Sequence, residues 1–137
     1  MQYWLVKSEP DSFSWDQQVA NGVEPWTGVR NHTARQNLQA MKLGDRAFFY
    51  HSNQGKEIVG VVEVVREAYP DPTAEKGPWV CVDMKAVGPM PRPVTLAAAK
   101  ADPKLADMAL VRLSRLSVMP VSKTHWDYIC RLGGWRG

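Results

Sequence analysis

Runs of large apolar side chains and segments of helical spacing follow one another along this chain, and they predict where its strands and helices lie. Residues 3–7 are a run of aromatic and branched side chains typical of a buried strand, and Pro10 interrupts further strand pairing. Residues 46–52 and 57–65 have the same character, and the short glycine-containing segment between them predicts a hairpin. The middle of the chain is therefore expected to be antiparallel sheet.

A helix is expected after residue 31, because apolar side chains recur there with helical spacing. A polar segment before it, residues 12–22, predicts a short helical turn, and the proline and glycine of residues 24–28 predict a loop. The positions that define the longer helix are the N-cap Asn31, the apolar residues Ala34, Leu38 and Met41, and Gly44 just past the last turn.

The second half of the chain predicts two more strands and two more helices. Residues 79–87 alternate with a period of two, and the prolines of residues 88–91 are expected to end that strand. Residues 116–121 are the last predicted strand. The expected helices are residues 95–100, capped by Thr95, and a closing helix through Leu132, capped by Ser122 and ended by two glycines.

Strands surrounded by short helices, without a repeating strand–helix–strand pattern, predict an α+β fold built on a small mixed barrel or a strongly curved sheet. With 137 residues and 45% hydrophobic content, the chain has the material for one domain, residues 1–137. No coiled-coil seam is present, so a monomer is expected.

Cysteine usage and hydropathy narrow the class of protein further. Cys81 and Cys130 are far apart, each within an apolar pattern, which predicts two buried side chains rather than a disulfide or a zinc site. No metal or cofactor is expected. No apolar run approaches the roughly 18 residues that span a bilayer, and no signal-peptide pattern is present, so a soluble, cytoplasmic protein is predicted.

The charge is distributed unevenly along the chain. Residues 1–65 carry 6 basic and 7 acidic side chains, whereas residues 66–137 carry 11 and 7. The basic excess of the second half suits a face that meets phosphates, although a solvated basic surface explains it equally well.

The six tryptophans are candidates for the core or for ligand contact. Trp4, Trp79 and Trp126 lie in regular patterns and are predicted to be core residues. Trp26 lies in a loop beside Arg30, where a planar ring can stack on a base while the cation and backbone amides meet phosphate. Tryptophans in loops also pack into hydrophobic cores, so the pattern leaves open whether Trp26 stacks on a base or packs in the core.

Tyr50, His51, Ser52 and Asn53 end a predicted strand with four hydrogen-bonding side chains, which suits recognition of a base edge. A structural role for the histidine is the alternative. His51 and Ser52 are adjacent, so in a strand they point to opposite faces and do not pair as base and nucleophile. Since no catalytic motif is present either, the chain is predicted not to be an enzyme.

Five segments, in this order along nearly the whole chain, resemble the motif set of the EVE domain family. They are residues 5–10 (LVKSEP), 26–31 (WTGVRN), 41–45 (MKLGD), 48–53 (FFYHSN) and 67–71 (EAYPD). The resemblance implies a PUA-like fold, a small mixed β-barrel flanked by short helices and related to the YTH and ASCH domains. It also implies recognition of a modified base, such as 5-methylcytosine or 5-hydroxymethylcytosine, in DNA or RNA, with no catalysis.

Carried onto this sequence, the resemblance implies a base-binding pocket. Residues 72–79 are short compared with eukaryotic members, so a nucleic-acid-contacting loop is expected to be reduced, which affects duplex binding more than pocket binding. The implied pocket residues are Lys7 and Ser8 at the rim, Trp26 as a wall, Arg30 and Asn31 as polar contacts at a helix N-terminus, and Tyr50, His51 and Ser52 on the opposite side.

Two other functions fit the same residues. One is a general RNA-binding module of the PUA-like kind, whose affinity would depend steeply on salt and not on base modification. The other is an enzyme or small-molecule binder that takes a free nucleoside or metabolite and uses His51 as an acid or base.

Overall fold

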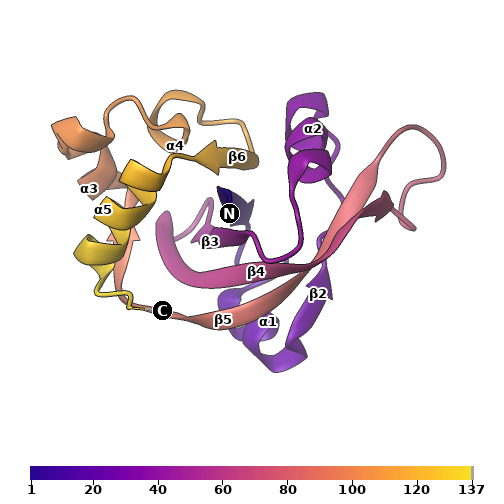
Figure 1. Ribbon diagram of the computed structural model, residues 1–137, viewed down its shortest axis with the longest axis horizontal. Coiled ribbons are helices and arrows are strands. Elements are labelled where there is room, and N and C mark those ends of the chain that lie inside the picture. The colour runs from indigo at the N-terminus through magenta and orange to yellow at the C-terminus, as the bar shows by residue number, and fades with distance from the viewer. Residues whose placement is uncertain (137) are drawn as a thin grey trace.

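A computed structural model describes residues 1–136 and shows an α+β domain built on one six-stranded mixed sheet (Figure 1). The strand order is β2-β5-β4-β3-β1-β6, with β1 and β3 parallel and the remaining pairs antiparallel. The predicted fold class is confirmed. The strands are β1 (Tyr3–Ser8), β2 (Val23–Pro25), β3 (Arg46–His51), β4 (Glu57–Pro70), β5 (Val80–Thr95) and β6 (Val118–Val121).

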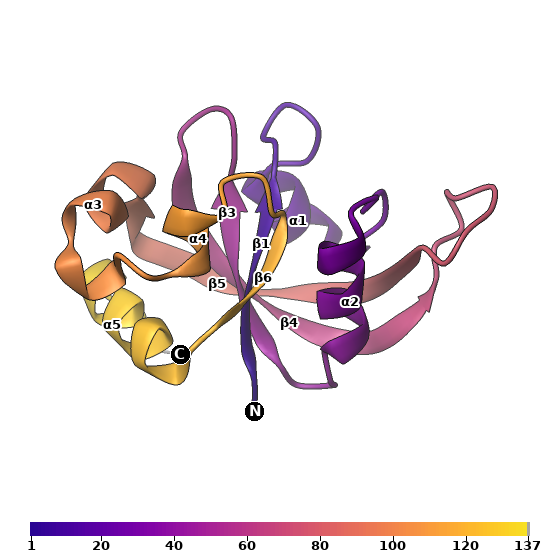
Figure 2. The same ribbon diagram turned by 90° about the horizontal axis from the view of Figure 1, so that it is seen from above.

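Short helices cover the sheet on two sides. Figures 1 and 2 show α3, α4 and α5 on one side of its centre and α2 on the other. The expected N-caps Asn31, Thr95 and Ser122 are confirmed, since each side chain accepts a backbone N–H from three residues further on. The helices are α1 (Trp15–Asn21), α2 (His32–Ala40), α3 (Leu96–Ala101), α4 (Ala109–Arg112) and α5 (Lys123–Gly133), with a 3₁₀ turn, η1, at Pro103–Leu105.

Two local predictions before β3 are wrong. Gly44 does not end α2, because the helix stops at Ala40; with φ +86° it forms the turn before β3, where its N–H donates to the carbonyl of Val64 at 2.9 Å. Residues 24–28 are not entirely loop, because β2 pairs with β5. A pairing partner distant in sequence turns this proline-containing segment into an edge strand.

The prolines of residues 88–91 do not end a strand, contrary to expectation, because β5 continues to Thr95. β2 pairs only with residues 83–85 of β5, so beyond that point one edge of β5 has no partner strand within residues 1–136. A residue without an N–H costs no ladder bond on such an edge. Bulges where β4 meets β5, as between Ile58 and Gly60, bend the hairpin around the core.

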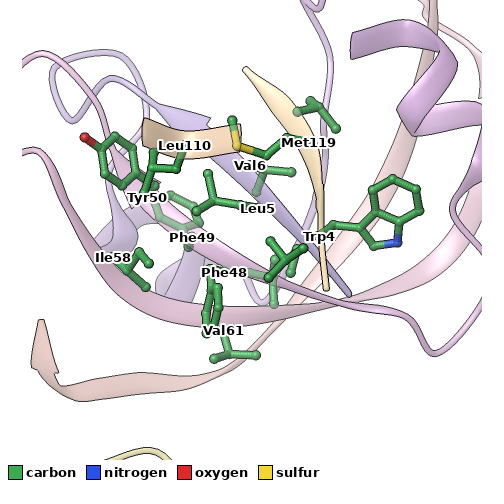
Figure 3. Close-up of a cluster of buried hydrophobic side chains, with 14 of the residues drawn as sticks. Trp4, Leu5, Val6, Phe48, Phe49, Tyr50, Ile58, Val61, Leu110 and Met119 are labelled. Atoms are coloured by element: carbon green, nitrogen blue, oxygen red, sulfur yellow. The ribbon is translucent and has the colours of Figure 1, made fainter. Parts of the chain in front are cut away.

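The centre of the core comes from the parallel pair β1 and β3. Leu5, Val6, Phe48 and Phe49 are buried, and Figure 3 shows them packed together with side chains from β4 and the C-terminal part. Trp4 lies at one end of this cluster, and its indole N–H donates to the buried carboxylate of Asp45 at 3.0 Å.

Trp4 and Trp126 are core residues, as predicted, but Trp79 is not. Trp79 is half-buried where the β4–β5 hairpin closes, and it stacks on His32 with ring centroids 4.8 Å apart. The hairpin extends this residue beyond the apolar interior, which a strand pattern alone does not reveal. Cys81 and Cys130 are buried and unpaired, as expected. Among the helices of residues 1–136, none combines the length and apolarity needed to cross a membrane.

Candidate functional site

A hollow of about 400 Å³ opens where the end of β1 meets the loop that follows β2. This volume lies within the range of small-molecule sites, about 300–1,000 Å³. We call it the Trp26 hollow. It is lined by Lys7, Ser8, Glu9, Ser12 and Phe13, by residues 24–30, and by Ser117.

Trp26 is both a packed residue and a wall of this hollow. Its exposed fraction is only 7%, and its ring meets Phe49 edge-to-face at 5.6 Å and Phe13 at 6.1 Å. Its backbone N–H donates to the carbonyl of Val82 at 2.7 Å, which fixes the start of the loop to β5. The sequence left open whether Trp26 packs in the core or faces a ligand. The structure combines the two positions, because the indole packs against Phe13 and Phe49 and also lines the hollow.

The loop of residues 26–31, between β2 and α2, is held at its far end by Asp71, and we call it the Trp26 loop. One oxygen of this buried carboxylate accepts the N–H of Gly28 at 2.8 Å and a guanidinium N–H of Arg30 at 3.0 Å, while the other accepts from Thr73. Burial acts to raise the pKa of Asp71, but the hydrogen bonds from Thr73, Gly28 and Arg30 outweigh it and hold the pKa at about 2. Asp71 is therefore an anion at neutral pH, and the loop is preorganised around it.

Lys7 and Ser8 occupy the rim, at the end of β1. The Lys7 ammonium donates to the carbonyl of Ser114 at 3.0 Å, and burial lowers its pKa. The Ser8 hydroxyl donates to the carbonyl of Phe13 at 2.6 Å, which leaves its oxygen able to accept a hydrogen bond. The hollow thus offers cationic, hydroxyl, carboxylate and aromatic groups around one opening.

The structure brings four of the eight residues expected in the pocket, Lys7, Ser8, Trp26 and Arg30, together around the Trp26 hollow. Tyr50 and Ser52 line a separate hollow, which Lys7 also lines. Asn31 caps α2 and lines a third hollow beside Ser114 and Arg115.

His51 lines none of these three hollows. Its Nε2 accepts the backbone N–H of Trp15 at 3.0 Å, at the start of α1. Burial lowers the pKa of His51, against smaller opposing effects of Glu57 and Asp16, which suits a neutral acceptor. The geometry therefore supports a structural role for His51, as the acceptor of a backbone N–H at the start of α1.

Two residues of the site carry no clear signal of their role in the sequence. Phe13 belongs to a polar segment of helical character, yet it packs against Trp26 and lines the hollow. Asp71 belongs to one of the five motifs, and an aspartate after a proline, with Thr73 two residues later, is a common turn pattern. Its contact with Arg30 depends on the fold and has no local signal.

The fold and the hollow define a mixed-sheet α+β domain with an aromatic-walled site at the end of its first strand. The chain matches the model of the EVE domain over residues 2–132. It therefore belongs to the EVE domain family, which confirms the resemblance read from the motifs. Thymocyte nuclear protein 1 of Gallus gallus is 38% identical, and the alignment covers 95% of this chain and 68% of the chicken protein.

Solved structures agree with this assignment. A Rhodopseudomonas palustris protein is 61% identical, with a TM-score of 0.94 over 100% of this chain and 96% of its own. Human THYN1, solved in complex with DNA containing 5-methylcytosine, is 33% identical, with a TM-score of 0.90 over 100% of each chain. A YTH domain of Zygosaccharomyces rouxii shares the fold, at 18% identity and a TM-score of 0.62 over 96% of this chain and 85% of its own.

Proposed function

We propose that this protein binds nucleic acid that carries a modified base and places that base in the Trp26 hollow. The observation that carries the proposal is the Trp26 loop itself. It presents an indole beside the polar end of β1, and the hydrogen bonds from Gly28 and Arg30 to Asp71 fix its position. The human relative that was solved with 5-methylcytosine DNA aligns over the whole of this chain, which supports the same ligand class here.

The energetics favour an extruded or single-stranded base. A base taken out of a duplex loses stacking worth a few kcal/mol, and an aromatic wall with edge hydrogen bonds can restore it. Stacking of one base on an aromatic side chain contributes about 1–3 kcal/mol. The hydrogen bonds from Gly28 and Arg30 to Asp71 restrict the conformations of the loop, which lowers the entropy cost of binding.

We further infer that binding is not followed by chemistry. Among the described residues that line the Trp26 hollow there is no histidine or cysteine, and the Ser8 hydroxyl donates to a backbone carbonyl rather than to a base. His51, the acid–base candidate of the sequence, lies outside the hollow with its Nε2 engaged by Trp15. A serine hydroxyl that donates to a backbone carbonyl is not activated by a general base, so Ser8 is a weak nucleophile in this arrangement.

The test is binding of the purified chain, at stated salt, to matched single- and double-stranded DNA and RNA oligonucleotides. The central base is cytosine, 5-methylcytosine, 5-hydroxymethylcytosine, adenine or N6-methyladenine. Trp26→Ala is expected to weaken binding of the preferred oligonucleotide by tenfold or more, which corresponds to about 1.4 kcal/mol. Trp26→Phe, which keeps an aromatic face, is expected to lose less.

Trp135→Ala is the matched control, because this tryptophan is half-buried and lines no part of the Trp26 hollow. Unfolding curves establish that each variant is folded. Equal affinity of wild type and Trp26→Ala would exclude the hollow as the base site. Binding that depends steeply on salt, with no preference for any modified base, would favour the general RNA-binding module instead.

A further inference from the structure

A second hollow lies directly beside the Trp26 hollow. It measures about 350 Å³ and shares Lys7 and Glu9 with its neighbour. We call it the lysine hollow, because Lys7, Lys56 and Lys100 line it, each from a different part of the chain. One lysine side chain is thus common to the walls of both spaces.

The lining of the lysine hollow is cationic. Lys56 and Lys100 are exposed, and within residues 1–136 their side chains form no hydrogen bond or ion pair. The Lys7 ammonium uses one donor on Ser114 and retains two. Glu9 is the one carboxylate among the described lining residues, so the three ammonium groups leave the lysine hollow with an excess of positive charge.

The backbone holds Lys56 at this place in an unusual conformation. Its φ is +48°, which is unfavourable for a residue with a side chain, and it follows a glycine at the tip of the β3–β4 hairpin. The N–H of Leu96 donates to the carbonyl of Lys56 at 2.8 Å, and this bond ties the tip to the first turn of α3. Lys100 lies one turn further along α3, so the same bond brings the two lysines to one hollow.

Tyr50 adds a neutral donor. Figure 3 shows its hydroxyl oxygen at the edge of the core cluster, directed away from Phe49. Within the described residues this hydroxyl has no hydrogen-bond partner, and burial raises its pKa, so it keeps its proton at neutral pH. Three ammonium groups and a phenol form a donor set suited to phosphate oxygens.

We propose that the lysine hollow binds a backbone phosphate of the same strand whose base occupies the Trp26 hollow. This inference rests on the proposed function and names an interaction that the base alone does not provide. The two hollows share Lys7 and Glu9, so a phosphate in the lysine hollow belongs to the nucleotide whose base is bound or to one close to it. Lysines act on phosphate as point charges, and they therefore add affinity without reading the base.

The experiment compares two double variants of the whole chain. Lys56→Gln with Lys100→Gln removes two charges from the lysine hollow, whereas Lys42→Gln with Lys123→Gln removes two exposed charges that line neither hollow. Affinity is measured over a range of salt concentrations for single-stranded oligodeoxynucleotides with a central cytosine, 5-methylcytosine or 5-hydroxymethylcytosine. The free nucleosides, which carry no phosphate, are the second probe.

The Lys56/Lys100 variant is expected to bind every oligonucleotide roughly tenfold more weakly at low salt. The slope of the logarithm of its binding constant against the logarithm of salt concentration is expected to become shallower by about 0.7 for each phosphate that the variant no longer neutralises. Its preference among the bases and its affinity for nucleosides stay unchanged. Equally weakened binding by the Lys42/Lys123 variant would overturn the inference, since it would reflect net charge alone. An unaltered salt slope in the Lys56/Lys100 variant would overturn it too.

The same data separate this inference from the proposed function. If the wild type binds in a lysine-dependent way but without preference for a modified base, the proposed function falls and the phosphate site stands. If the preference is present and the lysines contribute nothing, only the phosphate site falls. If the wild type binds no oligonucleotide, both fall.

Discussion

Arg30 and Asp71 are 41 residues apart in sequence, yet a guanidinium nitrogen of one lies 3.0 Å from a carboxylate oxygen of the other. Asp71 is fully buried at its side chain, and it also accepts the N–H of Gly28, which adopts φ +83°. Through these contacts the β4–β5 hairpin sets the position of the Trp26 loop. The hollow therefore depends on a residue that does not line it.

Asp71→Asn is expected to lower the free energy of unfolding by about 2 kcal/mol at neutral pH, because hydrogen bonds to a charged acceptor contribute about 1.5–3 kcal/mol. The pKa of Asp71 is about 2 in the fold against an ordinary value of 3.8. Its stabilisation is therefore fully present above 3.8 and is lost as pH falls through about 2. Denaturant unfolding from neutral to acidic pH checks this, with the exposed Asp11→Asn as control. A stability gap between wild type and Asp71→Asn that did not narrow in acid would contradict the assignment.

His51 is expected to make the start of α1 sensitive to mild acid. Burial lowers its pKa below the ordinary 6.5, so the neutral form is favoured in the fold. Stability is then complete above 6.5 and falls as pH drops through the lower folded value, because protonation removes the acceptor for the Trp15 N–H. Hydrogen exchange of the Trp15 amide against pH measures this directly. His51→Gln, whose amide oxygen still accepts, is expected to flatten the profile, whereas the exposed His32→Gln leaves it as in wild type.

Gly60→Ala is expected to destabilise the protein by about 1–3 kcal/mol, which is the usual range for overpacking. A Cβ at Gly60 would lie 2.5 Å from the ring of Trp15, and that ring meets Phe49 at 5.3 Å, next to Trp26. Thermal unfolding gives the loss, and affinity for the preferred oligonucleotide is expected to fall with it. Gly60→Ala should cost less stability in a Trp15→Leu background than in wild type, because the clash with the ring is then removed. Equal costs in the two backgrounds would show that the ring is not the obstacle.

Selectivity for a single methyl group on the bound base is expected to be modest. Burial of one additional carbon contributes about 0.8 kcal/mol, so 5-methylcytosine should bind roughly fourfold more tightly than cytosine. A hydroxymethyl group that gains a hydrogen bond in the hollow would be distinguished more sharply. Competition between oligonucleotides that differ only at this base measures the ratio. A preference of roughly a thousandfold for the methyl group would show that more than burial is involved.

Much of the fold could be read from local sequence. The strand at residues 3–7, the hairpin around residue 54 and the three N-caps are correct, because each depends on side chains within a few residues of one another. The incorrect predictions share a cause. Residues 88–91 continue as strand because one edge of β5 has no partner strand there among the described residues. Trp79 is not in the core because the β4–β5 hairpin extends beyond the apolar interior. In both cases the outcome depends on which strands are neighbours, and a local pattern does not contain that information.

The candidate site divides in the same way. The sequence by itself determined the family, the α+β class and the aromatic and cationic residues near the site, since motif order and side-chain chemistry are local properties. Only the tertiary structure decided that Asp71 holds the Trp26 loop, that His51 bonds to Trp15, and that Lys7, Lys56 and Lys100 meet at one hollow. These interactions join residues that are far apart in sequence. They form only when strand pairing brings those segments together, and local sequence patterns do not specify that pairing.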